Sequence, residues 1–333
     1  MNPIKVAVVG VGSIGGNHAR VLANRDDVEL IGVCDPHEAN AARVSHRHRV
    51  PAFDGLESLL AVKKPDAVVV AVPTVLHHRV AGAAIRAGIH VLLEKPMATS
   101  VQQSREITEL AKRHHVQLLV GHIERYNPAI QSLQQRLRDH EIGELYRVEV
   151  DRAGPFPARI SDVGVALDLA VHDLDIISSL LGAMPERVYA RSQQLLHHSH
   201  EDAIVGLINY PGDILAVLNV NWTTPVKKRE LRVYGRKGLF RVNYLTQELF
   251  LFHNPAQASV ENGWGPLGIT EGDMIRYNLA KEEPLAREID FFLNAVRNRV
   301  DLSQSVADSI TALHLSQCLV QSAQQGEAIT VQR

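Results

Sequence analysis

The stretch VAVVGVGSIGGNHARVL, residues 6–22, decides the fold of the N-terminal part of this chain. An apolar, strand-like run stops at Gly10, further glycines follow, and apolar residues then return at helical spacing. In such a strand–turn–helix the first glycine permits a tight turn, the second lets a pyrophosphate approach the backbone, and the third lets helix and strand pack closely. Gly10, Gly12 and Gly15 therefore predict a dinucleotide site with its phosphates at the helix N-terminus.

Short apolar runs recur through the first third of the chain, separated by segments with helical periodicity. They lie at 5–10, 28–35, 66–73, 90–94 and 117–121, with a weaker run at 50–53. Near-continuous apolar strands are typical of a sheet with helices on both faces. We therefore expect an α/β domain over residues 1–122, with a doubly wound parallel sheet of the Rossmann type.

Asp35 ends the second of these runs, twenty residues after Gly15. A carboxylate there can accept hydrogen bonds from both ribose hydroxyls of an adenosine and would repel a 2′-phosphate. The following Pro36-His37-Glu38 supplies no arginine for such a phosphate, which favours NAD over NADP. The alternative is that Asp35 only caps the next helix.

The triplet Glu94-Lys95-Pro96 closes the run at 90–94. Ligands of open α/β sheets bind outside the carboxyl ends of the strands, so Lys95 is predicted to face the cofactor cleft. The alternative is an ordinary solvated lysine. A cis peptide before Pro96 would fix the direction of the lysine.

Beyond residue 122 the alternation stops, and the pattern predicts an α+β domain over 123–333 with a large, open, mainly antiparallel sheet. Helices are expected at 127–140, 284–299 and 304–324. Strand-like runs, several of them separated by turn signals, lie at 145–151, 187–194, 203–210, 213–222, 230–234, 238–243 and 247–252.

A helix is predicted over 163–182, and it carries Asp168 and His172 four residues apart. This spacing puts both on one face, where a carboxylate can orient an imidazole and stabilise its protonated form, as a general base requires. The alternative is a surface or core histidine without a catalytic role. Asp173 and Asp175 are expected at the surface or in caps.

Further polar residues follow the sixth strand and the run at 145–151. VGHIERYNPAI, residues 120–130, carries Arg125 and Tyr126, which could face a polar ligand, and Asn127, which could equally be a helix cap. Arg152 and Arg159 could engage a diphosphate or a carboxylate, or form surface salt bridges. The histidine-rich LLHHSHED, 195–202, lacks a matching ligand set, so no metal site is predicted.

The length and composition of the chain limit the classes of protein to which it can belong. The length of 333 residues favours two domains, and 45% of the residues are hydrophobic. The 35 basic and 37 acidic residues nearly balance, so the net charge gives no argument for binding to nucleic acid or to an anionic membrane. The start MNPIKVAVVG leaves no room for a signal peptide and no apolar stretch is long enough to span a membrane, so we expect the protein in the cytoplasm. Cys34 and Cys318 are expected to be small buried residues, not a disulfide.

The glycine motif, the triplet at 94–96 and the Asp168-x-x-x-His172 pair together resemble the Gfo/Idh/MocA family of NAD(P)-dependent sugar and cyclitol oxidoreductases, over nearly the whole chain. The resemblance implies that Lys95 and His172 act at the reacting carbinol with support from Asp168, and that the open sheet face joins subunits into dimers or tetramers. We expect cofactor contacts at Gly10, Gly12, Ser13, Ile14, Gly15, Asp35, Pro73, Thr74, His77, Glu94 and Lys95. We expect substrate contacts at Lys95, Glu124, Arg125, Tyr126, Asn127, Arg152, Arg159, Asp168 and His172.

Within that family, residues 120–130 and 152–176 are similar to the members that oxidise the C3 hydroxyl of UDP-N-acetylglucosamine with NAD. The resemblance implies that an aminotransferase takes up the keto product on the way to 3-amino sugars of the lipid A type. Three alternatives stay open: oxidation of UDP-N-acetylglucosaminuronic acid, oxidation of a free sugar or inositol, and a regulator that senses NAD or a sugar without catalysis. The presence of Lys95, Asp168 and His172 together argues against the regulator.

Overall fold

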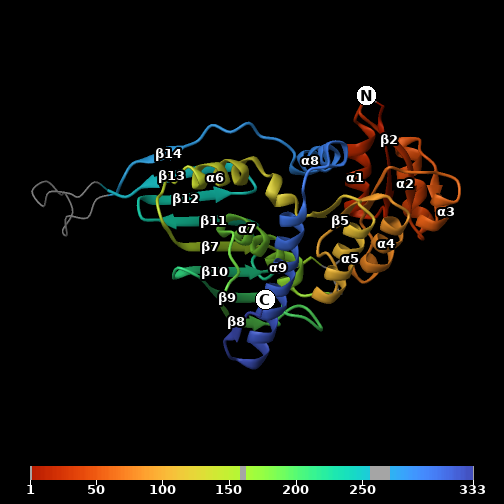
Figure 1. The fold of residues 1–333 in the computed structure, drawn as a ribbon. Helices are drawn as coiled ribbons and strands as arrows, with labels where there is room; N and C mark the ends of the chain where they lie inside the picture. The colour runs from red at the N-terminus through yellow and green to blue at the C-terminus, as the bar shows by residue number, and fades with distance from the viewer. Residues whose placement is uncertain (1, 158–162, 256–270, 333) are drawn as a thin grey trace, which may run out of the picture. The chain divides into compact units, whose positions relative to one another are not determined.

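The computed structural model describes residues 2–157, 163–255 and 271–332 (Figure 1). The chain forms two compact units. The first contains residues 1–123 and 283–314, and the second contains 124–282 and 315–333. Arg159, one of the expected substrate contacts, lies outside the described residues.

The first unit is built on a six-stranded sheet with the order β3-β2-β1-β4-β5-β6. All of its strand pairs are parallel, and every residue of the central strand β4 is buried. The strands are β1 (Ile4–Val9), β2 (Val28–Cys34), β3 (Ala52–Phe53), β4 (Ala67–Val70), β5 (His90–Glu94) and β6 (Leu118–Gly121). The predicted Rossmann sheet is confirmed, including β3 at the weak run.

Helices alternate with these strands: α1 (Ser13–Ala23), α2 (Glu38–His48), α3 (Leu56–Leu60), α4 (Thr74–Arg86) and α5 (Val101–Arg113). Each turns an apolar face to the core, as α1 does with Ala19 and Leu22. The first unit also contains α8 (Pro284–Asn298), which contacts α1. An ion pair of 2.8 Å between Arg297 and Asp27 ties α8 to the residues just before β2.

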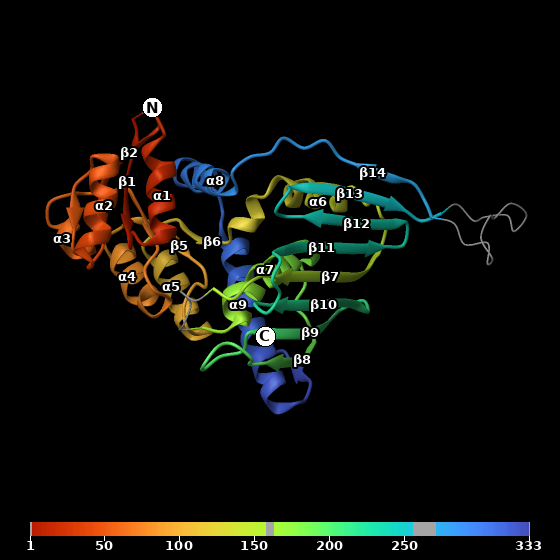
Figure 2. The ribbon, with the colours of Figure 1, turned by 180° about the vertical axis from the view of Figure 1, so that it is seen from behind.

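The second unit holds a nine-stranded sheet with the order β14-β13-β12-β11-β7-β10-β9-β8-β15, seen from both sides in Figures 1 and 2. Its strand pairs are antiparallel except β7 with β10, which is parallel. The predicted strands correspond to β7 (Leu145–Ala153), β8 (Arg187–Gln193), β9 (Ala203–Tyr210), β10 (Ile214–Asn221), β11 (Lys228–Gly235), β12 (Gly238–Asn243) and β13 (Glu248–His253). Two short strands, β14 (Met274–Arg276) and β15 (Ile329–Thr330), were not predicted, because two or three residues are too few to display an alternating pattern of apolar and polar side chains.

One face of this sheet is covered by helices. Along β9 buried and exposed side chains alternate, with Ile204 and Ile208 buried and Val205 and Leu207 exposed. Helix α9 (Ser303–Gln325) packs on the buried face, where a Cβ added to Gly206 would lie 2.5 Å from a methyl of Leu319. In the described part of the chain the opposite face of the strand is exposed, the arrangement expected of an antiparallel sheet.

The helical segment predicted over 163–182 has two parts. Residues Ala166–Ala170 form a single π-helical turn, η2, and α7 continues from Val171 to Leu181 before Gly182 ends it in the left-handed conformation. Single π turns inside helices are frequent at functional sites. The remaining helical elements of this unit are the 3₁₀ turn η1 (Ile123–Tyr126) and α6 (Pro128–Arg138).

Both cysteines are buried, as predicted, and neither is part of a disulfide. Burial raises the pKa of the Cys34 thiol to about 12. Among the described residues, no helix combines the length and hydropathy needed to cross a bilayer.

Candidate active site

The glycine turn between β1 and α1 has the local geometry that the motif predicts. Gly10 has φ +85°, and a Cβ there would lie 2.6 Å from the carbonyl oxygen of Ala71. A Cβ on Gly15 would lie 1.8 Å from the carbonyl oxygen of Gly10. Nothing lies within 4 Å of the Cβ position of Gly12 among the described residues. Gly10 and Gly15 are thus required by the fold itself, whereas the space at Gly12 is open.

That open space suits a pyrophosphate. Helix α1 begins directly after Gly12, and in the described part of the chain no side chain caps its first turn. Its first amides therefore remain as donors at the positive end of the helix dipole, where an anion is bound most favourably. Ser13 and Ile14 are exposed beside it. The site thus fits the diphosphate of NAD.

Asp35 has a structural task that the sequence did not reveal. Its carboxylate accepts hydrogen bonds from the backbone amides of Val11 and His37, both at 2.9 Å. It therefore joins the end of β2 to the glycine turn. Each carboxylate oxygen has a second lone pair, so the predicted contact with an adenosine ribose stays compatible with these bonds.

Glu94 and Lys95 close β5. Glu94 accepts a hydrogen bond of 2.7 Å from Nε2 of the buried His18 and another of 3.2 Å from the backbone amide of Lys95. Burial raises the pKa of Glu94, but the hydrogen bond and charge of His18 and the charge of Lys95 more than offset this, so its pKa is lowered. The Lys95–Pro96 peptide is cis.

His77 lies one turn into α4 and is buried. Its Nδ1 lies 2.9 Å from the carbonyl oxygen of Pro96, and its Nε2 lies 2.9 Å from that of Val72. The ring therefore connects the turn after β4 to the Lys95–Pro96 turn. Pro73 and Thr74, at the start of α4, are more accessible than His77 and remain the better placed of the predicted cofactor contacts there.

In the second unit, the π turn η2 carries Asp168, and His172 follows in the first turn of α7. Both side chains are half-buried, so they are accessible to a substrate while partly removed from water. The sequence predicted a regular α-helix here. The insertion of a π turn changes the local helical geometry between the two residues.

Asp173 is a correction to the sequence analysis, because it is buried and not at the surface. It accepts hydrogen bonds of 2.5 and 3.0 Å from Nε and Nη2 of Arg152, whose Nη1 bonds Glu124 at 3.2 Å. Burial lowers the pKa of Arg152, but the charges of Asp173 and Glu124 outweigh this and raise it. Arg152 is thus held by carboxylates of the same unit.

Asp175 is also buried, where a surface or capping residue was expected. It accepts two hydrogen bonds of 2.6 Å from Arg125, so the charge of Arg125 is balanced within the protein and its predicted ligand contact stays a prediction. Asn127 caps α6, accepting from the amide of Ala129 at 3.1 Å and donating to the carbonyl of Tyr244 at 3.1 Å. These residues brace the segment after β6.

Arg229 is a functional candidate that the sequence analysis missed. It lies on β11 opposite Arg152 on β7, and its Nη1 donates to the carbonyl oxygens of Ala153 and Lys228 at 2.6 and 2.8 Å. Burial and the charge of Arg152 lower its pKa, while Asp173, Glu124 and Asp168 oppose this. The pairing of β11 with β7 places the Arg229 guanidinium where it interacts with the charge of Asp168. A lone arginine in a sequence gives no signal of such a pairing.

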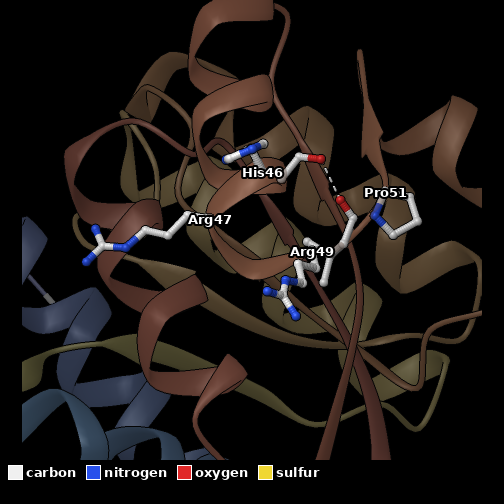
Figure 3. Close-up of a pocket in the computed structure, with 6 residues that line it drawn as sticks. His46, Arg47, Arg49 and Pro51 are labelled. Carbon is white, nitrogen blue, oxygen red and sulfur yellow. Dashed lines mark hydrogen bonds between the residues drawn. The ribbon is translucent and has the colours of Figure 1, made fainter.

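A surface hollow of the first unit lies away from the glycine turn (Figure 3). Helix α2 begins at the carboxyl ends of the parallel strands and ends at their amino ends, where β3 starts. The hollow lies at the amino ends of the strands, and Ser45 Oγ donates a hydrogen bond of 2.6 Å to the carbonyl of Val50 across it. It is lined by Ser45, His46, Arg47, Arg49, Val50 and Pro51.

Comparison with known proteins agrees with this geometry. Residues 4–122 match the family model described as "Oxidoreductase family, NAD-binding Rossmann fold", and residues 130–241 match the "GFO/IDH/MocA C-terminal domain". The chain belongs to the Gfo/Idh/MocA family of oxidoreductases. Its first unit is an NAD-binding Rossmann domain, and NAD is its cofactor.

Two curated relatives and one solved structure are similar over most of the chain. UDP-N-acetylglucosamine 3-dehydrogenase of Acidithiobacillus ferrooxidans is 33% identical over 88% of both chains. Inositol 2-dehydrogenase of Rhizobium meliloti is 25% identical, over 98% of this chain and 99% of the relative. The structure of UDP-N-acetylglucosamine 3-dehydrogenase GnnA from Acidithiobacillus ferrooxidans has a TM-score of 0.87 at 30% identity, covering 98% of this chain and 99% of that one.

Proposed function

We propose that this protein oxidises the C3 hydroxyl of UDP-N-acetylglucosamine, with NAD as the oxidant. The 3-keto product would be the substrate of an aminotransferase that forms a 3-amino sugar of the lipid A type. The observation that carries the proposal is the relative that is 33% identical over 88% of both chains. Asp168, His172 and the triplet at 94–96 supply the residue types that this reaction requires.

Each of the three residues has a proposed role. His172 accepts the proton of the C3 hydroxyl, and Asp168 orients the imidazole and stabilises it once it is protonated. Lys95 donates a hydrogen bond to the carbinol oxygen and offsets the negative charge that develops there. Bound NAD would supply the acceptor for the hydride that leaves C3.

The diphosphate of the substrate needs cations that are not fully neutralised. Arg125 and Arg152 are held by Asp175 and Asp173, so their charge is balanced within the protein. Among the described residues Arg229 donates to the backbone carbonyls of Ala153 and Lys228, and the charge of Asp168 acts on its guanidinium. We therefore add Arg229 to the proposed substrate contacts, with Glu124 and Arg152 supporting it.

The experiment is a comparison of four substrates with the purified protein and NAD. UDP-N-acetylglucosamine, UDP-N-acetylglucosaminuronic acid, N-acetylglucosamine and myo-inositol are supplied separately, and formation of NADH is followed by its near-ultraviolet absorbance. We expect the highest kcat/KM with UDP-N-acetylglucosamine. Turnover of the uronic acid alone, or of substrates without a nucleotide, would replace the proposed substrate. Binding of NAD with no turnover of any of them would support the regulator instead.

We also propose that the open face of the nine-stranded sheet joins copies of this chain. On that face the apolar side chains of β8 and β9 are unusually exposed, with 37% of Tyr189, 51% of Val205 and 40% of Leu207 accessible. Light scattering during size-exclusion chromatography is expected to show a dimer or tetramer. Leu207→Glu should shift it toward monomer, whereas a monomeric wild-type protein would contradict the proposal.

A further inference from the structure

We propose that Glu201 is a positioning residue for the helical segment that carries Asp168 and His172. Its backbone carbonyl accepts a hydrogen bond of 2.9 Å from the amide of Val165, and its Oε1 accepts one of 3.1 Å from the amide of Ala166. The first amides of a helix have no partner within the helix, so an outside acceptor is needed. Glu201 supplies two acceptors at once.

The glycine before these amides makes room for the Glu201 carboxylate. A Cβ added to Gly164 would lie 2.1 Å from Oε1 of Glu201, and its other nearest atoms belong to the same carboxylate. The φ of Gly164 lies outside the left-handed region, so the backbone conformation there does not require glycine. Among the described residues, the Glu201 carboxylate is thus the nearest group to a side chain at position 164, and an alanine would displace that carboxylate while leaving the backbone conformation allowed.

The loop that presents Glu201 is held by its own hydrogen bonds. Asp202 accepts from the amides of Leu195 and His197 at 2.8 and 2.9 Å. Nδ1 of His197 in turn accepts from the amides of Ser199 and His200, both at 3.0 Å. The histidine-rich stretch 195–202 thus forms a frame in which an imidazole and a carboxylate act as acceptors for backbone amides.

The backbone of Asp202 also anchors this frame to the sheet. Its amide donates to the carbonyl of Gln193 at 3.0 Å, and its carbonyl accepts from the amide of Trp222 at 2.8 Å. Glu201 is the preceding residue, so its position relative to β8 and β10 is fixed. The rigid sheet therefore determines where Glu201 meets the helical segment.

A short chain of hydrogen bonds connects Glu201 to the proposed base. Glu201 bonds the amide of Ala166, and the carbonyl of Ala166 accepts the amide of Val171, which is the i to i+5 bond that defines the π turn. His172 is the next residue. Loss of the Glu201 carboxylate frees the start of the π turn, and this changes the position of His172 relative to Asp168.

Kinetics of four variants test the proposal, which rests on the proposed function for this readout. Glu201→Ala should lower kcat about 10- to 100-fold, the effect of a displacement of about 1 Å at a catalytic group, and leave KM for NAD unchanged. Glu201→Gln keeps an acceptor oxygen and should retain most of kcat. Gly164→Ala should match Glu201→Ala, and the double variant should be no worse than either single variant, because both remove the same contact. Additive losses, or a full kcat in Glu201→Ala, would overturn the proposal.

Hydrogen exchange gives a readout that does not depend on the substrate. The backbone amide of Ala166, whose acceptor is the Glu201 carboxylate, should exchange faster in Glu201→Ala and Gly164→Ala than in the wild-type protein and Glu201→Gln, measured on peptides spanning 163–172. The amide of Val165 keeps its acceptor in Glu201→Ala, because that acceptor is the backbone carbonyl of residue 201. Unchanged protection in Glu201→Ala would overturn the proposal even if kcat fell. Failure of the wild-type protein to oxidise any sugar would refute the proposed function alone, because the exchange measurement still decides whether Glu201 holds this segment.

Discussion

The glycine turn of the first unit and the η2–α7 segment of the second unit are held in place in different ways. At the turn, the atoms that matter come from neighbouring residues and from the adjacent strands, and Gly10 and Gly15 are required for the close approach of the backbone. In η2 and α7, the decisive partners are Arg152, Glu201 and Arg125, which lie on other elements. A local motif can therefore be recognised in a sequence, whereas a segment held by distant side chains cannot.

The largest expected effect comes from His172, because it tests whether this segment carries the chemistry at all. His172→Ala removes the proposed base and should lower kcat about 10²- to 10⁴-fold while the Kd of NAD stays unchanged. The matched control is His253→Ala, an exposed histidine at the end of β13, with kcat expected as in the wild-type protein. Equal losses of kcat and NAD affinity in His172→Ala would contradict the assigned role.

Asp173 tests how far η2 and α7 depend on distant partners. Asp173→Ala leaves the buried guanidinium of Arg152 with Glu124 as its carboxylate partner among the described residues, and should lower the free energy of unfolding by about 3–5 kcal/mol, measured by urea denaturation. The control is Glu248→Ala, which breaks the more exposed pair with Arg276 and should cost no more than about 1 kcal/mol. Similar losses in both variants would show that burial of the first pair is unimportant.

Variants of Gly12 and Gly15 test how the glycine turn of the first unit is held in place. Gly15→Ala forces backbone atoms apart and should destabilise the protein without NAD by about 1–3 kcal/mol. Gly12→Ala places its methyl in open space, so without NAD its stability should change by less than about 0.5 kcal/mol. With NAD present, Gly12→Ala should bind the cofactor at least about tenfold more weakly, because the methyl occupies the approach of the pyrophosphate. Calorimetry without NAD measures the stability of each variant, and calorimetry with NAD measures its affinity for the cofactor. Equal losses of stability in Gly12→Ala and Gly15→Ala would contradict the distinct roles assigned to the two glycines.

The smallest expected effect is a pH dependence at Glu94. Its pKa is lowered in the folded protein, so its contribution to stability is present above the ordinary pKa of 4.5 and is lost as the pH falls through the folded value. Glu94→Gln lacks this contribution. The melting temperature of the wild-type protein should therefore exceed that of Glu94→Gln at neutral pH, and the difference should shrink in acid. A difference that grows in acid would mean that the pKa is raised.

Much of the fold could be predicted because its signals are local. Apolar runs that alternate with helical periodicity gave β1 to β6, and the strands β7 to β13 followed from alternation and turn residues. The π turn was missed, since one extra residue in a helical turn leaves the apolar spacing almost unchanged. The packing of α8 against α1 was missed as well, because an amphipathic helix does not specify the surface that its apolar face covers.

The candidate site was predictable only where a motif is continuous. Asp168 and His172 share one segment, and the glycine turn is contiguous, so both could be identified before the structure. The pairing of Asp173 with Arg152 and of Asp175 with Arg125 joins residues more than twenty positions apart, and no spacing rule connects them. Glu201 and Arg229 became candidates only when strand register and loop contacts showed what lies beside them.

The return of α8 to the first unit has a consequence for biosynthesis. During translation residues 1–123 leave the ribosome early, but the helix that contacts α1 and bonds Asp27 follows only after all of 124–282 have emerged. The nascent N-terminal sheet therefore lacks α8 until that point, and the side of α1 that contacts α8 is uncovered. A chaperone that recognises exposed apolar helix faces would find its target at this stage of synthesis, and a chain truncated before residue 283 would keep that target permanently.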